Sequence, residues 1–503
     1  MLESLLTALG VIFSPYHLLL LFLGVLLGIV LGAVPGLGGI VGLTVVLPFV
    51  FEMSPSEAMV LLVGLVAVVT SSDSVPAVLF AVPGTAAAQA TIMDGHPMAK
   101  KGEAGRAFGA IYSASMMGGV FGALALLLAI PIMRPLVLSV GSPELFMLGI
   151  LGISMVGVLS GRAPLQGLVA GMAGVLASMV GMDPQTGVLR WTFGALYLWE
   201  GLPLVPAVMG VFGIPEIVEM VIRRRSIADV PRHAIKGVLV GIGDTFRHWF
   251  LVLRCSVLGT WIGLIPGLGS DVVDWFAYGH TVQSSRPRES FGKGDVRGVI
   301  GPESAANAKL GGSLIPTIAF GIPGSLQMII LLGAFMILGL RPGPEMLTDN
   351  LDVTFTIVWS LVLANVFGTL ILLPLTGQLA KLALVRIQIL APVIISILFL
   401  ASFLTTRDYG DLVVLIGFGL FAWVMKLAGW PRPPLVLGLV LGPIIGKYLF
   451  ISTHAYNGFG WLARPGVILL FLAMVASVVF GLAREKRGET APEGSVVGGP
   501  HEA

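Results

Sequence analysis

The chain has 503 residues, of which 56% are hydrophobic and only 11% are charged, and its formal net charge is +2. Average soluble domains carry about 25% charged residues, so the composition excludes an ordinary soluble domain and predicts an all-α polytopic membrane protein. The near-neutral charge argues against a nucleic-acid partner. The single cysteine, Cys255, excludes an intrachain disulfide and a cysteine-based metal site, and the histidines show no metal-ligand spacing.

Apolar runs recur along nearly the whole chain. A helix that crosses a hydrocarbon core of about 30 Å needs about 20 apolar residues. Runs of this size include residues 16–34, 107–130, 355–375 and 467–483. We expect roughly ten to twelve spans and several shorter re-entrant segments. The first run lacks a basic leader, so we expect no cleavable signal.

Two pairs of similar segments indicate an internal duplication. GIVLGAVPGLG at residues 28–38 and GTWIGLIPGLG at residues 259–269 share the pattern G-x3-G-x2-P-G-L-G. VPAVLFAVPG at residues 75–84 is similar to IPTIAFGIPG at residues 315–324. The matches predict a first membrane repeat, a basic cytoplasmic connector, a second membrane repeat and a disordered cytoplasmic tail. These four parts are residues 1–222, 223–254, 255–483 and 484–503.

The charges of the loops indicate that the two repeats have opposite orientations in the membrane. Short cytoplasmic loops are rich in Lys and Arg. The basic loop follows the second Pro-Gly pair in the first half, whereas it follows PGLG in the second half. Matching loops would face opposite sides, as in the inverted-topology repeats of secondary transporters. We therefore expect a periplasmic N-terminus and a cytoplasmic C-terminus. The basic residues are Lys100, Lys101 and Arg106 in the first half and Arg286, Arg288, Lys293 and Arg297 in the second.

The Pro-Gly pairs inside apolar sequence form the candidate binding site. Proline breaks a helix and glycine permits positive φ, which frees backbone groups at membrane depth. Freed amides at a helix N-terminus bind carboxylates, and freed carbonyls at a C-terminus bind cations. We therefore expect a substrate anion and a coupling cation, Na+ or H+, between the repeats. The predicted substrate-binding residues are Ser72, Ser74, Pro83, Gly84, Thr85, Asn307, Ser313, Pro323, Gly324 and Ser325. The predicted cation-coupling residues are Gly36, Gly38, Asp73, Gly267, Gly269 and Asp271.

These predictions have structural alternatives. The breaks could serve only to kink or pack helices. Asp73 and Asp271 could cap broken helix ends rather than act in transport. Glu303, Asn307 and Lys309 could hold one another at the mouth of the site, or they could lie in the interface.

The chain resembles the large membrane subunit of the tripartite tricarboxylate transporters over about residues 15–480. TIMDGHPMAKKGEAGRA at residues 91–107 is similar to the family segment T-x2-D-G-x-P-M-A-x2-G-x-A-G-x-A. PESAANAKLGGSLIP at residues 302–316 is similar to the family block P-E-x-A-N-N-A-x2-G-G-x-L-I-P. The two G-x3-G-x2-P-G-L-G elements complete the resemblance.

The resemblance implies a permease of the bacterial inner membrane that takes up a di- or tricarboxylate, or a similar small organic anion. It implies coupling to an ion gradient without another cofactor, and the sequence has no G-x4-G-K-[ST] loop for ATP. It also implies three kinds of neighbour, which are a small membrane subunit, a periplasmic solute-binding protein and membrane lipid. Whether several copies of the chain form a homo-oligomer stays an open question at this point.

Departures from the family pattern fall in the predicted site. SSDS at residues 71–74 stands where members usually carry Tyr-Gly-Gly-Ser. Ala81 stands where Asn is common, and Ala306 replaces one Asn of the Asn-Asn pair. A specificity for citrate therefore does not carry over, and Asp73 becomes a candidate for proton coupling.

Other functions are open at this point. An autonomous organic-anion carrier would work without a binding protein. A membrane channel would need a continuous polar pore, but no span shows regularly spaced polar residues. An enzyme would need a reactive constellation, but Asp271 and Asp274 have ordinary helical spacing and no G-x-S-x-G or H-E-x-x-H motif is present. We therefore expect no enzymatic activity.

Overall fold

The described part of the chain is helical almost throughout, which confirms the predicted all-α class of a polytopic membrane protein. One short antiparallel sheet pairs β1 (Gly181–Met182) with β2 (Leu189–Arg190). The computed structural model describes residues 1–34, 38–81, 88–159, 164–223, 236–266, 270–382, 387–456 and 458–486. Residues 224–235 of the predicted connector and residues 487–503 of the predicted tail lie outside these ranges.

The helices have the following bounds in chain order. They are α1 (Leu2–Ile12), α2 (Pro15–Ala33), α3 (Gly38–Val46), η1 (Leu47–Val50), α4 (Pro55–Ser72), α5 (Ser74–Phe80), α6 (Gln89–Lys100), α7 (Ala104–Leu138), α8 (Ser142–Leu159), α9 (Pro164–Ser178), η3 (Leu196–Leu198), α10 (Leu204–Arg223), α11 (Val238–Arg247), α12 (Trp249–Gly263), α13 (Ser270–Ser284), η4 (Arg288–Ser290), α14 (Arg297–Phe320), α15 (Leu326–Ile337), α16 (Pro344–Leu347), α17 (Leu351–Leu382), α18 (Ile387–Thr406), α19 (Gly410–Leu427), α20 (Pro433–Ala455), η5 (Gly460–Ala463) and α21 (Pro465–Lys486).

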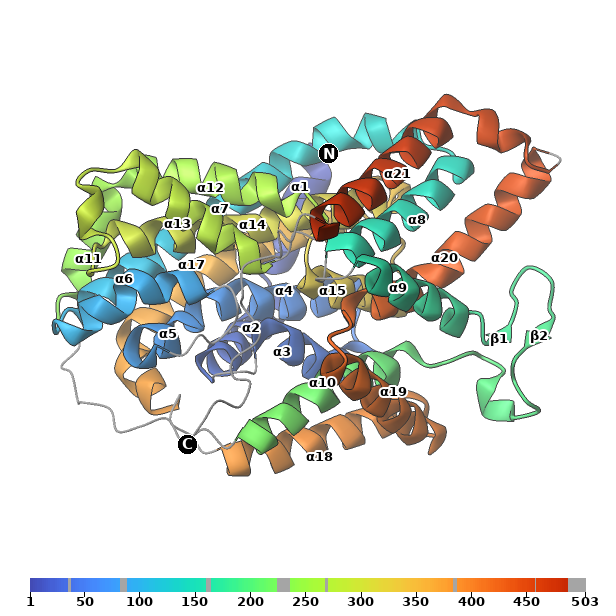
Figure 1. Cartoon of the computed structure of the whole chain (residues 1–503), viewed down its shortest axis with the longest axis horizontal. Coiled ribbons are helices and arrows are strands. Elements are labelled where there is room, and N and C mark those ends of the chain that lie inside the picture. Colours follow the sequence, from blue (N-terminus) through green and yellow to red (C-terminus); the bar gives the residue numbers. More distant parts are fainter. Residues whose placement is uncertain are drawn as a thin grey trace.

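Among the described residues, 6 helical stretches are long and apolar enough to cross a membrane. They are Pro15–Ala33, Pro55–Phe80, Ala104–Leu138, Leu351–Leu379, Gly410–Leu427 and Pro433–Ala455. Other apolar helices have 10–17 residues, and several of them adjoin the Pro-Gly segments. Helix α14 has 24 residues, which is long enough to span, but it carries polar residues along its length. It lies beside α7, α12 and α13 along the long axis of the molecule (Figure 1).

The packing partners of the helices recur in the two halves of the chain. Four contacts made by first-half helices have counterparts made by the matching helices of the second half. The corresponding contacts are α2 on α4 and α12 on α14, α4 on α17 and α14 on α7, α3 on α15 and α13 on α6, and α1 on α17 and α11 on α7. The orientation of the repeats relative to a membrane stays a prediction.

Glycines of the shared G-x3-G pattern explain two of these contacts. A Cβ atom on Gly28 of α2 would overlap the carbonyl oxygen of Leu65 on α4. A Cβ atom on Gly259 of α12 would overlap the carbonyl oxygen of Ala305 on α14. Both glycines therefore let two backbones meet without a side chain between them.

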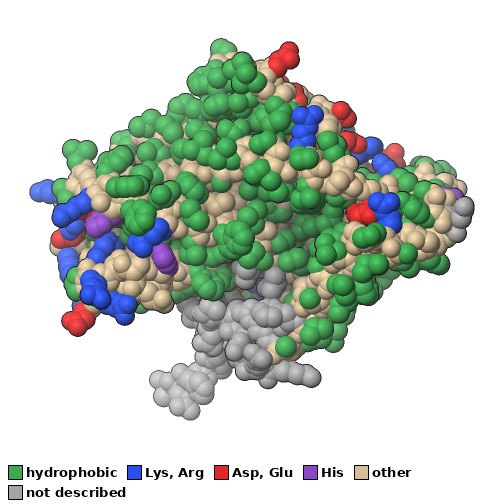
Figure 2. Space-filling model, turned by 90° about the horizontal axis from the view of Figure 1, so that it is seen from above, with side chains coloured by type: hydrophobic (Ala, Val, Ile, Leu, Met, Phe, Trp, Pro, Cys, Tyr) green, Lys and Arg blue, Asp and Glu red, His purple; other side chains and the backbone are tan. Residues whose placement is uncertain are grey.

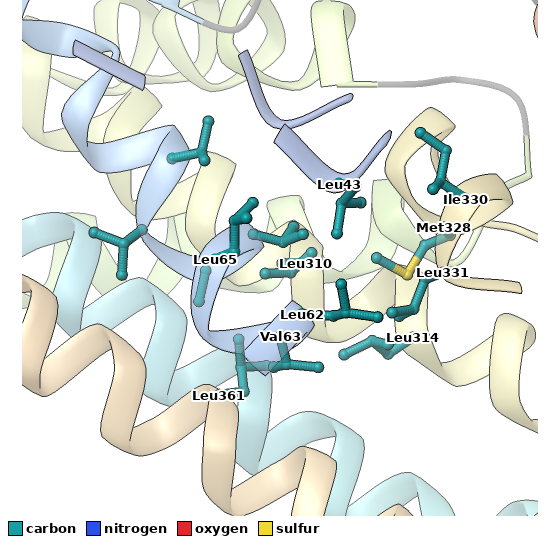
Figure 3. Close-up of a cluster of buried hydrophobic side chains, with 14 of the residues drawn as sticks. Leu43, Leu62, Val63, Leu65, Leu310, Leu314, Met328, Ile330, Leu331 and Leu361 are labelled. Atoms are coloured by element: carbon teal, nitrogen blue, oxygen red, sulfur yellow. The ribbon is translucent and has the colours of Figure 1, made fainter. Parts of the chain in front are cut away.

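An apolar core forms where α3, α4, α14, α15 and α17 meet, and it holds the short helices α3 and α15 in place (Figure 3). Its labelled side chains are Leu43, Leu62, Val63, Leu65, Leu310, Leu314, Met328, Ile330, Leu331 and Leu361.

The surface is divided between apolar and charged regions. Hydrophobic side chains cover most of the face in Figure 2, and Lys and Arg gather at one end of the molecule. The two basic loops of the sequence meet there, because Lys101 Nζ donates a hydrogen bond to the carbonyl oxygen of Lys293 at 2.6 Å. The loops that were predicted to share the cytoplasmic side therefore lie together.

Matching helices of the two halves end in the same backbone conformation. Ala81 follows α5 with φ 52°, and Gly321 follows α14 with φ 68°. Both angles lie in the left-handed region, where glycine is unstrained and asparagine is better tolerated than alanine. An Asn at this position, as the family resemblance implies, would adopt this conformation with less strain than Ala81 does.

We predict that Ala81→Gly stabilises the protein and that Gly321→Ala destabilises it. A Cβ atom in the left-handed region costs roughly 1–2 kcal/mol. Glycine avoids this cost but loses more conformational entropy on folding, so each variant should change the free energy of unfolding by about 0.5–1 kcal/mol. Thermal unfolding in detergent measures both. Gly417→Ala in the interior of α19 is the comparison for a glycine at ordinary helical φ; its Cβ would meet open space, so this variant should stabilise the protein. Shifts of the same sign for the two variants would contradict the prediction.

Candidate functional site

The structure describes part of the predicted site. Gly36, Pro83, Gly84, Thr85, Gly267 and Gly269 lie outside the described residues. Asp271 belongs to the first turn of α13, but its side chain is outside the description. Gly38 begins α3 with φ 48°. The site is therefore built from the helices that flank the Pro-Gly segments.

The first-half polar run lies buried where α4 passes into α5. Asp73 joins the two helices and is 1% exposed. The Ser72 hydroxyl donates to the carbonyl oxygens of Gly28 and Val69, both at 3.1 Å, so it helps to dock α4 on α2. The Ser74 hydroxyl instead reaches across to α14.

Asn307 on α14 connects the two halves of the chain. Its side chain is 1% exposed, and its Oδ1 accepts hydrogen bonds from Thr70 Oγ1 at 2.9 Å and from Ser71 Oγ at 3.4 Å. Its Nδ2 donates to the backbone carbonyl of Glu303 at 3.2 Å. The polar faces of α4 and α14 are therefore in direct contact.

The Pro323-Gly324-Ser325 segment joins α14 to α15, and buried polar atoms surround it. Ser313 Oγ, Ser325 Oγ and Gln327 Oε1 have no hydrogen-bond partner among the described residues. The three residues are 0%, 3% and 5% exposed. A Cβ atom on Gly324 would lie 2.6 Å from Ser313 Cα, so these two residues are immediate neighbours. Buried polar atoms normally have partners, and this cluster therefore indicates a place for a polar ligand.

The N-termini of α3 and α15 meet beside this cluster. A Cβ atom on Gly39, the second residue of α3, would lie 2.9 Å from Nε2 of Gln327, the second residue of α15. Each helix N-terminus presents backbone N–H groups and a partial positive charge. Two such ends, next to hydroxyls that have no partner in the described part of the chain, can bind a carboxylate.

Three residues of this region, Gln327, Thr91 and Ser115, are not among the predicted site residues. Gln327 stands at the N-terminus of α15, and Thr91, Ser115 and Ser74 all hydrogen-bond Glu303. Ser74 was predicted as a substrate ligand, not as a partner of Glu303. The resemblance of residues 91–107 and 302–316 to the family pattern could have pointed to this contact. Thr91 is the first residue of one segment, and Glu303 lies in the other.

A second polar cluster holds the basic end of the molecule together. Asp94 Oδ1 accepts hydrogen bonds from the backbone amides of Gly294 and Asp295, both at 2.8 Å. Asp94 Oδ2 accepts one from the Tyr278 hydroxyl at 2.9 Å. Asp94 is therefore an anchor between α6, α13 and the loop before α14.

The same loop carries an ion pair outside the membrane-spanning segments. Arg297 donates to Asp295 from Nε at 2.9 Å and from Nη2 at 2.6 Å. Burial acts to raise the pKa of Asp295, but the hydrogen bonds from Arg297 and Ser290 hold it below its usual value. The loop is therefore fixed by a charged carboxylate.

An apolar groove lies elsewhere, between α9, α19, α20 and residues 195–202. Its volume is about 610 Å³, and its lining includes Tyr197, Val413 and Phe418. It shares no residue with the polar clusters and lacks their convergent donors. We therefore place the candidate site at α3 and α15 and not in this groove.

Comparisons with known proteins add an independent observation. A family model described as "Tripartite tricarboxylate transporter TctA family" matches residues 18–437. An uncharacterized 52.8 kDa protein in the TAR-I ttuC' 3' region of Agrobacterium vitis is 30% identical over 471 residues, which cover 93% of this chain and 94% of the relative. An uncharacterized protein in the TAR-II ttuC' 3' region of the same organism is 31% identical over 191 residues, or 38% of this chain and 79% of the relative. No solved structure matches the chain.

We predict that Asp94→Ala lowers the melting temperature. The change leaves two backbone amides and the Tyr278 hydroxyl without their acceptor, and hydrogen bonds to a charged group contribute about 1.5–3 kcal/mol. Asp94→Asn keeps one acceptor oxygen and should lose less. Glu52→Ala in an exposed loop is the control. Equal melting temperatures for Asp94→Ala and the unchanged protein would show that Asp94 is not an anchor.

Proposed function

Because this chain belongs to the tripartite tricarboxylate transporter TctA family, we propose that it is the large permease subunit of a secondary active uptake system for a di- or tricarboxylate. Substrate passes to it from a periplasmic solute-binding protein, and a small membrane subunit completes the complex. The chain alternates access around a site near the middle of the membrane. The 94% coverage of a relative supports a comparison of whole subunits.

The hydroxyls of Ser313 on α14 and Ser325 before α15, which have no partner among the described residues, carry the proposal for the substrate site. A carboxylate there accepts hydrogen bonds from Ser313 and Ser325 and from the backbone amides of the first turn of α15. The N-terminus of α3 adds a second partial positive charge. Gly324 lets this segment pack directly against Ser313 and the carbonyl oxygen of Gly263, where a Cβ atom would not fit.

The negative charge of the proposed substrate calls for a coupling cation. A carboxylate that enters a cell against an inside-negative potential meets a barrier of about 2.3 kcal/mol per charge and 100 mV. Co-transport of Na+ or H+ removes this barrier and drives accumulation. Of the predicted cation residues, Gly36, Gly267 and Gly269 lie outside the described ranges.

The basic end of the molecule supports a location in the bacterial inner membrane with this end in the cytoplasm. Its two loops lie together and carry an excess of Lys and Arg, as cytoplasmic loops do. The N-terminus is then periplasmic and the C-terminus cytoplasmic.

We predict that the combined change Ser313→Ala and Ser325→Ala raises the KM for substrate at least tenfold. Loss of one hydrogen bond to a charged ligand costs about 1.5–3 kcal/mol. A cost of about 1.4 kcal/mol already weakens the affinity for the ligand tenfold. Uptake of labelled citrate and succinate is measured in proteoliposomes that contain the small subunit, with and without the binding protein. Ser304→Ala is the control, since its hydroxyl donates to Gly301 of its own helix.

Each outcome of this uptake experiment decides one part of the proposal. An unchanged KM in the double variant would contradict the substrate site. Uptake that is independent of the binding protein would favour an autonomous carrier. The absence of uptake for every di- and tricarboxylate would contradict the substrate class.

We predict that Lys101→Cys, in a Cys255→Ala background, reacts with a membrane-impermeant maleimide in inverted vesicles and not in intact cells. Lys101 lies exposed at the basic end, and Cys255 is the only native cysteine and is buried. Glu52→Cys serves as the opposite control and should react from outside. Labelling of Lys101→Cys in intact cells would show that the basic end faces the periplasm and would contradict the proposed orientation.

A further inference from the structure

Glu303 is a buried carboxylate that is held entirely by hydroxyl groups among the described residues. It lies on α14 and is 3% exposed. Its Oε1 accepts hydrogen bonds from Ser74 at 2.6 Å and from Thr91 at 2.7 Å, and its Oε2 accepts one from Ser115 at 3.1 Å. The three donors belong to α5, α6 and α7, so three first-half helices converge on one second-half side chain.

This set of partners suits a group that changes its charge. A hydroxyl both donates and accepts, whereas an arginine or lysine partner would favour the ionised carboxylate alone. When Glu303 is ionised, all three hydroxyls donate to it. When Glu303 binds a proton, it donates to one hydroxyl, which rotates and accepts. The cluster therefore satisfies both protonation states without moving a helix.

Other ionisable groups around Glu303 are in different environments. Asp94 is held by backbone amides and Tyr278, and Cys255 contacts Thr281. The groups on the surrounding elements are Asp73 before α5, Asp94 on α6, Tyr112 on α7, Arg254 and Cys255 on α12, Asp274 and His280 on α13, and Lys309 on α14. The described contacts therefore give Glu303 three hydroxyl donors, whereas they give Asp94 one hydroxyl and two backbone amides.

The position of the donors links the charge of Glu303 to movement. Ser74 and Thr91 stand on α5 and α6, on either side of the first-half Pro-Gly segment. If these helices shift relative to α14, Glu303 loses two of its donors. An ionised carboxylate without donors at membrane depth is far less stable than the neutral acid, so the shift requires protonation.

We propose that Glu303 carries the coupling proton of this transporter. The proton enters from the periplasmic side, stays on Glu303 while α5 and α6 change their position against α14, and leaves to the cytoplasm when the hydroxyls can again donate to the carboxylate. Asn307 and Ser313 follow Glu303 along α14, and Ser313 belongs to the proposed substrate site on the same helix. This inference rests on the proposed carboxylate transport.

The test compares Glu303→Gln with the unchanged protein in proteoliposomes. Glutamine has the shape of the protonated acid but cannot release a proton. Exchange of external labelled citrate for internal citrate is measured without a gradient, and accumulation is measured under an imposed pH gradient. We expect Glu303→Gln to keep exchange within about threefold and to lose accumulation driven by the pH gradient. The unchanged protein should show both activities.

A second variant keeps the test valid if Glu303→Gln does not fold. Ser115→Ala removes one donor to the ionised form, so proton release should need a higher pH. The pH profile of exchange should move upward by about one unit, because a hydrogen bond to a charged group is worth about one to two pH units. Ser304→Ala is the matched control and should leave the profile in place.

The outcomes separate the two proposals. If Glu303→Gln still accumulates citrate under a pH gradient, or if Ser115→Ala leaves the pH profile unchanged, the role of Glu303 is overturned and carboxylate transport stands. If only a sodium gradient drives the unchanged protein, the coupling proton is likewise overturned. If the unchanged protein exchanges neither citrate nor any other di- or tricarboxylate, the proposed function itself is overturned, and the role of Glu303 with it.

Discussion

The close approach of backbones around α14 is the constraint on which the rest of the structure depends. A Cβ atom on Gly118 of α7 would overlap the carbonyl oxygen of Ser304, and one on Gly259 of α12 would overlap that of Ala305. Packing this dense excludes water from the polar residues of α14. Glu303 and Asn307 therefore need protein partners and find them in the first half of the chain. Ser313 lacks a partner among the described residues, and that is where we place the substrate.

Much of the architecture could be predicted from local sequence. Composition is sufficient for the membrane class, because a hydrocarbon core demands long apolar helices. The shared glycine pattern pointed to a duplication, and Gly28 and Gly259 do make equivalent contacts. The Pro323-Gly324 pair correctly indicated a helix break, which lies between α14 and α15. Proline and glycine have this effect through the backbone, so the sequence alone indicates it.

The partners of individual side chains could not be predicted in the same way. Thr91 and Ser74 are 212 and 229 residues from Glu303 in the chain, and a hydroxyl in an apolar helix has no periodic signal that names its partner. Asp94 stood in a family-like segment, but only the fold shows that it anchors a loop. The left-handed conformation of Ala81 could not be predicted, because alanine rarely adopts positive φ and its presence in a sequence does not indicate it.

A substrate anion at the start of α15 and a titratable carboxylate on α14 together define the proposed transport site, and both proposals depend on where the anion binds. The most direct test is an experimental structure of the protein with bound citrate. We expect a carboxylate of citrate within about 3 Å of Ser313 Oγ and Ser325 Oγ, beside the first turns of α3 and α15. Citrate bound in the apolar groove beside α19, or away from both serines, would contradict it.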